Sequence, residues 1–161
     1  MQIRSYSADY ESAVISLWER CGLIRPWNDP KKDIVRKLKI DPDLLLVGLE
    51  DESLIGTIMI GYEGHRGWIN YLAIDPDHRR KGYVRQLMVV AEKLLAERGC
   101  PKINLQVRTD NRDAVDFYKA LGYQIDDVTS LGKRLNGVPR TSLTAASSPT
   151  TYLPSSNSGP Y

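Results

Sequence analysis

The sequence is poor in the residues that build metal sites and disulfide frameworks. It contains two cysteines, Cys21 and Cys100, and two histidines, His65 and His78, among 161 residues. The cysteines form no CxxC pair and are too few for a disulfide framework, and zinc patterns that combine paired cysteines and histidines are absent. We therefore expect two ordinary thiols in a reducing compartment and no metal site.

Long apolar runs and an excess of one charge are also missing. The longest fully apolar stretches, such as residues 44–47, fall far short of the roughly 18 residues of a membrane span. The first residues lack the basic and then apolar pattern of a secretory signal. Lys and Arg number 22 against 20 Asp and Glu, and this net charge of +2 is too small for a general polyanion binder. We predict a cytoplasmic protein that binds neither a membrane nor nucleic acid.

The composition changes abruptly after Leu135. Of the 26 residues from 136 to 161, 16 are Ser, Thr, Pro or Gly, and Arg140 is the only charged one. Such a segment cannot bury enough apolar surface to offset the entropy lost on ordering. We predict one domain over residues 1–135 and a flexible Ser/Thr/Pro-rich C-terminal tail over residues 136–161.

The hydrophobic pattern of residues 1–135 predicts an α/β (α+β) fold with one mixed sheet covered by helices. Apolar residues recur with the helical period in four segments and fill short runs between turn residues elsewhere. The expected helices cover residues 10–21, 30–38, 82–98 and 112–121. The expected strands, about seven, cover residues 2–6, 44–49, 54–62, 67–74 and 102–108, with two more in 123–135.

The stretch richest in chemistry is a strand that runs into a basic loop and then a helix. The expected strand 67–74 leads to the basic loop 78–81, and Gly82 begins the next helix. A helix start carries unpaired N–H groups and a positive dipole end, which together attract an anion. The stretch is neither GxGxxG nor GxxxxGK[ST]. It is therefore an anion site of another kind, or only a solvated turn in which glycine eases entry into the helix.

Two motifs resemble those of the GNAT family of N-acetyltransferases. The acetyl-CoA-binding pattern R/Q-x-x-G-x-G/A is matched by Arg79, Gly82 and, less well, Val84. The pattern N-x-x-A-x-x-F-Y-x-x-x-G-F/Y is matched by Asn111, Ala114, Phe117, Tyr118, Gly122 and Tyr123. The two lie in the family's order, about 30 residues apart, on elements of the right type. The resemblance covers residues 1–135 and implies a mostly antiparallel central sheet flanked by four helices.

The resemblance also implies where acetyl-CoA would bind. In the family, backbone groups of the fourth strand, here Leu72, Ala73 and Ile74, pair with the pantetheine arm like an added strand. Arg79 takes the family's leading position in the loop, and Asn111 contacts the cofactor arm. The loop amides that would hold the pyrophosphate belong to Arg80, Lys81, Gly82, Tyr83, Val84 and Arg85. Val84 departs from the family pattern, and its β-branched side chain either crowds the phosphates or points into the core.

The catalytic groups follow less directly. In the family, Tyr118 would lie near the thioester sulfur and could donate a proton to it; otherwise it is a core aromatic beside Phe117. Ribosomal-protein acetyltransferases of the family carry Glu where this sequence has Gln106, which cannot take up a proton near neutrality. The base would then be a water relay or another residue. Glu63 and Asp75 are candidates, although carboxylates near turns are commonly only solvated.

The absence of a strong base indicates which kind of amine the site would accept. An α-amine of pKa about 7.7 to 8.0 is substantially neutral at physiological pH, whereas a lysine of pKa about 10.4 is about 0.1% neutral. A site without a strong base suits the α-amine. Trp27 and Asn28 lie in the connection between the first two helices, which in the family helps to wall the acceptor pocket. Trp27 is either an acceptor platform or a core plug.

The expected activity is acetyl-CoA-dependent transfer of an acetyl group to a primary amine by direct attack in a ternary complex. The partners would be acetyl-CoA and a small amine or a peptide or protein N-terminus, bound by a monomer or homodimer. Two alternatives remain open. One is a non-catalytic acyl-CoA-binding or protein-interaction module, favoured by Val84 and Gln106. The other is a nucleic-acid binder that uses residues 78–81 and Arg85, against which the near-neutral charge argues.

Overall fold

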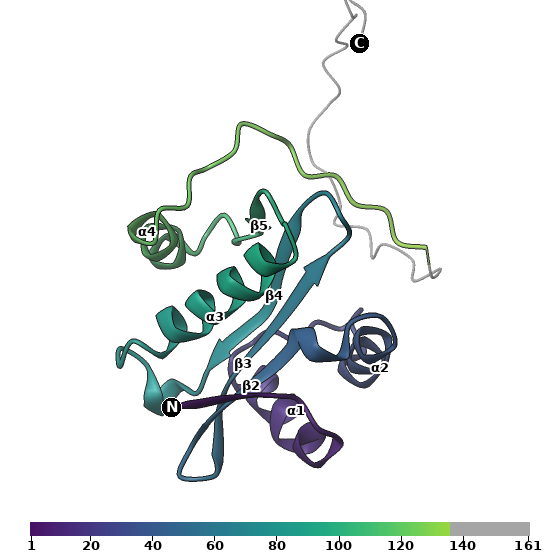
Figure 1. Ribbon diagram of the computed structural model, residues 1–161, viewed down its shortest axis with the longest axis vertical. Helices are drawn as coiled ribbons and strands as arrows, with labels where there is room; N and C mark the ends of the chain where they lie inside the picture. Colours follow the sequence, from purple (N-terminus) through teal and green to yellow (C-terminus); the bar gives the residue numbers. More distant parts are fainter. Residues whose placement is uncertain (136–161) are drawn as a thin grey trace, which may run out of the picture. The chain divides into compact units, whose positions relative to one another are not determined.

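The computed structural model describes residues 1–135, which form four α-helices, five strands and three short 3-10 turns (Figure 1). The strands are β1 (Gln2–Ser5), β2 (Leu45–Glu50), β3 (Ser53–Tyr62), β4 (Gly67–Ile74) and β5 (Ile103–Leu105). The helices are α1 (Glu11–Arg20), α2 (Pro30–Ile40), α3 (Tyr83–Glu97) and α4 (Arg112–Ala120). The 3-10 turns are η1 (Ala8–Tyr10), η2 (Pro42–Leu44) and η3 (Pro76–His78).

The strands form one sheet in the order β1-β2-β3-β4-β5. The first four strands run antiparallel to their neighbours, whereas β4 and β5 are parallel. A parallel pair needs a crossover, which α3 supplies. The predicted class, a mixed and mostly antiparallel sheet with four helices, is confirmed.

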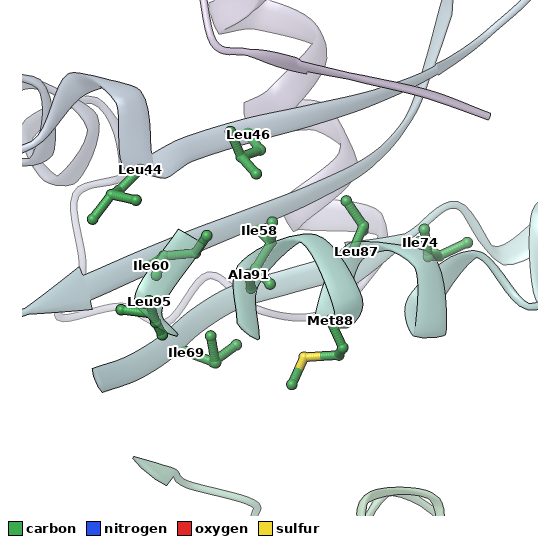
Figure 2. Packing of buried hydrophobic residues seen from close by; sticks show 10 residues of the cluster. All are labelled: Leu44, Leu46, Ile58, Ile60, Ile69, Ile74, Leu87, Met88, Ala91 and Leu95. Carbon is green, nitrogen blue, oxygen red and sulfur yellow. The ribbon is translucent and has the colours of Figure 1, made fainter. Parts of the chain in front are cut away.

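The helices cover both faces of the sheet and divide the core in two. On one face α3 packs its buried residues Leu87, Met88, Ala91 and Leu95 on inward side chains of β2, β3 and β4 (Figure 2). On the other face the buried side chains of α1 and α2 pack on Leu45, Val47, Leu49 and Ala73. Alternate strand residues thus point into different halves of the core, as the period of two requires.

Local sequence signals set the helix ends. The side chain of Asp29 accepts a hydrogen bond from Lys32 N at 3.1 Å and Pro30 is the first residue of α2, a combination that fixes a helix start. The side chain of Asn111 caps α4 in the same way, because its Oδ1 accepts a hydrogen bond from Ala114 N at 3.2 Å. Gly99 follows α3 with a φ of 75°, a left-handed conformation that glycine adopts without strain.

The strand count differs from the prediction. The sheet has five strands among the described residues, because residues 123–135 contain no strand and β5 spans three residues instead of 102–108. The apolar residues of this segment, Ile125, Val128, Leu131 and Leu135, recur three or four positions apart and are all exposed. A half-buried strand needs alternation with a period of two. The consecutive Asp126 and Asp127 further oppose burial.

The chain divides into two units, Met1–Asp127 and Val128–Tyr161. In the second unit, residues 128–135 are exposed and contain neither helix nor strand. The predicted tail, residues 136–161, lies outside the described residues. Over the part of the chain that is described, no helix has the length and apolar character needed to cross a membrane.

Candidate active site

A gap opens where β4 and β5 part. The two strands are paired only from Gly67 with Ile103 to Ile69 with Leu105. In the described part of the chain, the rest of β4 pairs with β3 alone. Leu72, Ala73 and Ile74, the residues expected to bind the pantetheine arm, lie in this half of the strand. Their outer edge therefore has no strand partner and can accept an extended ligand as an added strand. Within this edge, the Ile74 carbonyl accepts a hydrogen bond from Cys21 Sγ at 3.4 Å.

The basic turn brings several backbone N–H groups together at the start of α3. Arg80 and Gly82 both adopt the left-handed conformation, with φ of 61° and 78°. Gly82 is the N-cap of α3 and offers no capping side chain, so the N–H groups of the first turn have no partner within the helix. A Cβ built on Gly82 would meet no atom within 4 Å. The space above the helix start is open to an anion.

The side chains of this turn are basic and exposed. Arg79, Arg80, Lys81 and Arg85 all face solvent, and Arg79 Nη2 lies 4.0 Å from Cys21 Sγ. The cations thus form a rim around the free N–H groups. The site residues expected between 79 and 85 are therefore brought together in one place by the turn and the first turn of α3.

Glu50, at the end of β2, holds this turn to the sheet. The hydroxyl of Tyr83 donates a hydrogen bond to its carboxylate, His78 Nε2 lies 3.4 Å from it, and Lys81 Nζ lies 4.0 Å away. The hydrogen bond from Tyr83, aided by the charges of Lys81 and His78, lowers the pKa of Glu50. Sequence reasoning missed Glu50, because it is 33 residues from Tyr83 and belongs to no motif.

Val84 and Asp75 flank the turn without adding a base. Val84 packs against the hydrophobic core beneath α3, so its side chain points inward. Asp75 is buried and binds Arg20 at 2.6 Å and Asp77 N at 3.0 Å. Burial alone would raise the pKa of Asp75, but the hydrogen bonds from Asp77 and Arg20 and the charge of Arg20 outweigh it and lower this pKa. A carboxylate held in its ionised form is a weak proton acceptor.

Tyr118 lies on α4, and Asn111 is the N-cap residue of this helix. The Asn111 carbonyl oxygen caps the helix, which leaves the amide nitrogen of its side chain for a ligand. Tyr118 meets the rings of Phe117 and Tyr123 edge to face, with centroids 5.4 and 5.8 Å away. Burial raises its pKa above 10.0, so the hydroxyl stays protonated at neutral pH and can donate a proton.

Tyr118 borders a cavity of about 930 Å³ between α3, β5 and α4. The cavity is lined mostly by apolar side chains such as Leu95, Leu105 and Val115. It contains no residue of the basic turn. The lining of this cavity therefore connects Tyr118 with β5 and does not reach the basic turn.

Glu63 lies in the turn between β3 and β4. Its two carboxylate oxygens accept hydrogen bonds from His65 N and Arg66 N, each at 2.8 Å. This turn adjoins Gly67, at the end of β4 opposite to Leu72–Ile74. Glu63 thus stabilises its own turn, and its hydrogen bonds do not connect it to the basic turn.

Trp27 and Asn28 lie in the connection between α1 and α2. Trp27 is 50% exposed and, with Arg25 and residues 108–110, lines a cavity of about 460 Å³. Asn28 Nδ2 donates to the hydroxyl of Tyr71 at 3.4 Å. The exposure of Trp27 rules out the core plug and leaves a side chain that a ligand can reach.

The described residues contain no group of three or more His, Cys, Asp or Glu side chains that could hold a metal ion. The groups that the structure places at the site are backbone amides, the basic rim and tyrosine hydroxyls.

A strand edge without a partner beside a helix start is suited to an extended ligand with an anionic group. Residues 10–123 match the model of the Acetyltransferase (GNAT) family. The chain belongs to this family, and it is an N-acetyltransferase.

Curated relatives agree with this assignment. An acetyltransferase of Pectobacterium atrosepticum is 50% identical over 135 residues, which cover 84% of this chain and 96% of the relative. An acetyltransferase of Sodalis glossinidius is 52% identical over 136 residues, with the same coverage of both chains.

Solved structures share the fold. Ard1 from Thermoplasma volcanium has a TM-score of 0.66 and 25% identity, and the match covers 78% of this chain and 83% of that one. The PaiA N-acetyltransferase from Thermoplasma acidophilum, solved in complex with coenzyme A, has a TM-score of 0.66 and 20% identity over 80% of this chain and 92% of that one.

Proposed function

We propose that this acetyltransferase uses acetyl-CoA and transfers its acetyl group to a primary amine by direct attack in a ternary complex. The observation that carries the proposal is the free edge of β4 at Leu72–Ile74 beside the uncapped start of α3 at Gly82. An extended pantetheine arm fits the strand edge, and a pyrophosphate fits the N–H groups and the basic rim. The PaiA structure with coenzyme A supports the same choice of ligand.

The transfer needs no group that the site lacks. The neutral amine nitrogen attacks the thioester carbonyl carbon, the carbon–sulfur bond breaks, and the amine releases its extra proton to water. A backbone N–H of β4 would polarise the carbonyl, and the Tyr118 hydroxyl would give a proton to the leaving thiolate. The tyrosine then recovers its proton from solvent. Its raised pKa keeps it in the donating form.

We infer an acceptor with a readily deprotonated amine, such as an α-amine or a small amine. Neither candidate base is suited to strip a proton from lysine: Glu63 closes a turn, and the pKa of Asp75 is lowered. An amine of pKa about 8 is roughly 200-fold more abundant in its neutral form at pH 7.4 than one of pKa about 10.4. The exposed Trp27 at the 460 Å³ cavity offers the acceptor a contact surface.

A thiol-release assay with acetyl-CoA tests the proposal. Two matched peptides are compared, one with a free α-amine and no lysine, the other N-acetylated with one lysine, beside a panel of small amines and polyamines. We expect faster release with the α-amine at pH 7.4, and a rate for the lysine peptide that rises about tenfold per pH unit towards pH 9. Binding of acetyl-CoA without thiol release for any amine would contradict transfer and select a non-catalytic acyl-CoA-binding module.

A further inference from the structure

A bulge interrupts β4 at the point where the strand leaves β5. Thr57 of β3 pairs with Ala73 and Met59 pairs with Asn70, so Tyr71 and Leu72 together face Ile58. A bulge leaves its extra residue outside the ladder and redirects the local backbone. The bulge begins two positions beyond Ile69, the last β4 residue that pairs with β5, so it lies beside the gap.

The bulge is strained at Tyr71. Its φ is 46°, a left-handed value that a residue with a bulky side chain rarely adopts. Tyr71 is the only described non-glycine residue within a strand that has a positive φ. Strain of this kind persists only where the surroundings determine the conformation.

The first restraint on Tyr71 comes from below the sheet. Thr57 Oγ1 donates to the carbonyl oxygen of Tyr71 at 2.9 Å and accepts from Trp18 Nε1 at 2.8 Å. The Trp18 ring stacks on the Tyr71 ring, with centroids 3.9 Å apart and planes 21° from parallel. Trp18 and Thr57 are completely buried, so they hold both the backbone and the ring of Tyr71 against a rigid base.

The second restraint acts at the hydroxyl. Tyr71 donates to Asp33 Oδ2 at 2.6 Å, and Asn28 Nδ2 donates to the tyrosine oxygen at 3.4 Å. Burial and the bond to Asp33 raise the pKa of Tyr71 to about 12, so the hydroxyl remains a donor throughout the physiological range. Asp33 belongs to α2 and Asn28 to the connection that precedes it. The hydroxyl of Tyr71 thus connects the β4 bulge to the segment between α1 and α2, which also carries Trp27.

We propose that Tyr71 is a positioning residue, whose clamped side chain holds the β4 bulge so that a backbone N–H of residues 71–72 donates to the thioester carbonyl. The inference rests on the proposed use of acetyl-CoA. Two buried residues and one carboxylate converge on one strained backbone position, and that position adjoins the strand edge assigned to the ligand. A purely structural contact would not require the strained conformation, since an unbulged β4 would satisfy the ladder without it.

The test compares ligands that differ only in the acetyl group. Calorimetric titration gives the dissociation constants of CoA and acetyl-CoA for the wild type, Y71F and Y71G, with Y62F as the matched control. Tyr62 also donates its hydroxyl, to Gly64 O at 3.3 Å, but in the turn at the other end of β4. Infrared spectra of bound acetyl-CoA labelled with ¹³C at its carbonyl report the hydrogen bond directly. A thermal melt of each variant checks that it folds.

We expect the ratio of the CoA to the acetyl-CoA dissociation constant to fall by roughly 3- to 10-fold in Y71G, the worth of one hydrogen bond to a neutral carbonyl, and by less in Y71F. The carbonyl band should move back towards its position in free acetyl-CoA, while CoA affinity and Y62F stay at wild-type values. D33A should repeat the effect of Y71F, and D33N, which keeps an oxygen acceptor, should largely restore it. If the Tyr71 variants do not fold, the comparison of D33A with D33N still tests the proposal.

The possible failures are distinguishable. If the wild type binds neither ligand, the proposed use of acetyl-CoA is wrong. If it binds both, but the ratio and the carbonyl band are the same in Y71F, Y71G and D33A, the positioning role is overturned and acetyl-CoA binding stands. A wild-type carbonyl band that does not shift on binding also overturns the positioning role.

Discussion

Gly82 is the residue where backbone conformation and access for a ligand coincide. Its φ of 78° and the open space around its Cβ position allow the chain to turn into α3 and leave the helix N–H groups uncovered. A side chain there meets strain of about 1–2 kcal/mol and stands in the path of an anion. The position therefore matters more for binding than for folding.

The variant G82D is expected to abolish acetyl-CoA binding while the protein stays folded, because its carboxylate would occupy the anion site and repel the phosphates. Calorimetric titration measures the affinity, and circular dichroism checks the fold. G99D is the matched control, since Gly99 has a similar φ of 75° and open surroundings but follows the other end of α3. Equal affinities for G82D and the wild type would refute the site.

Tyr118 is the second decisive residue. With a confirmed acceptor, Y118F should lower kcat by roughly 10- to 1000-fold at nearly unchanged acetyl-CoA affinity, because the hydroxyl acts on the departing thiolate. Because burial raises the pKa of Tyr118, its deprotonation should cause no loss of activity below pH 10. Y123F serves as control, since it removes a neighbouring hydroxyl that binds Glu92 at 3.0 Å. Normal turnover by Y118F would show that another group donates the proton to the thiolate.

At the scale of elements, the first turn of α3 has separate inward and outward roles. Val84 packs on the core, whereas the N–H groups of the same turn face the site. V84A should therefore cost about 1 kcal/mol of unfolding free energy, the loss expected for partly buried methyl groups, and leave acetyl-CoA affinity within about twofold. Denaturant unfolding and titration measure the two effects. Markedly tighter binding by V84A would show that valine crowds the phosphates after all.

A second element-level feature is the pair of Asp75, beside η3, and Arg20, at the end of α1. The pKa of Asp75 is lowered from its ordinary 3.8, so its ionised form stabilises the fold above pH 3.8, and this contribution disappears as the pH falls through the lower value in the folded protein. D75N should lose about 1–3 kcal/mol at neutral pH. This difference in unfolding free energy between D75N and the wild type should vanish at acidic pH, where Asp75 is protonated.

Unfolding curves from pH 7 to pH 2 measure this deficit. D77N, an exposed carboxylate in the same turn, should change stability by less than about 0.5 kcal/mol. A deficit of D75N that is the same at pH 2 and pH 7 would mean that packing, and not charge, accounts for it.

At the scale of the whole molecule, the composition break after Leu135 predicts that residues 136–161 do not contribute to folding. Their Ser, Thr and Pro content cannot support a core of their own. A chain cut after Leu135 should melt within a few degrees of the full chain, since 1 kcal/mol shifts the Tm of a domain of this size by roughly 3 to 6 °C. Calorimetry of both chains measures this. A larger drop would show that the segment packs on the domain.

Much of the architecture could be predicted from short-range patterns. Helix periodicity, the caps at Asp29 and Asn111 and the glycine after α3 act within a few residues, so the positions of the four helices and the first four strands follow from sequence alone. The basic turn was also predictable, because a strand, a loop and a helix start that are adjacent in sequence must be adjacent in space. The last two predicted strands were wrong because residues 123–135 lack the alternation that a strand face needs.

The contacts of the site depend on tertiary structure. Pairing of β2 with β3 and of β3 with β4 brings Glu50 to the turn that holds His78 and Tyr83, and the same folding seats Tyr71 on Trp18 and beneath Asp33. These partners are separated by about 30 residues or more, and no local preference encodes their meeting. Local patterns along the chain are enough to predict most of the elements and the basic turn, since the forces that form them act within a few residues. Only the packed sheet decided where β4 bulges, which carboxylates are held by other groups, and which side chains surround the gap.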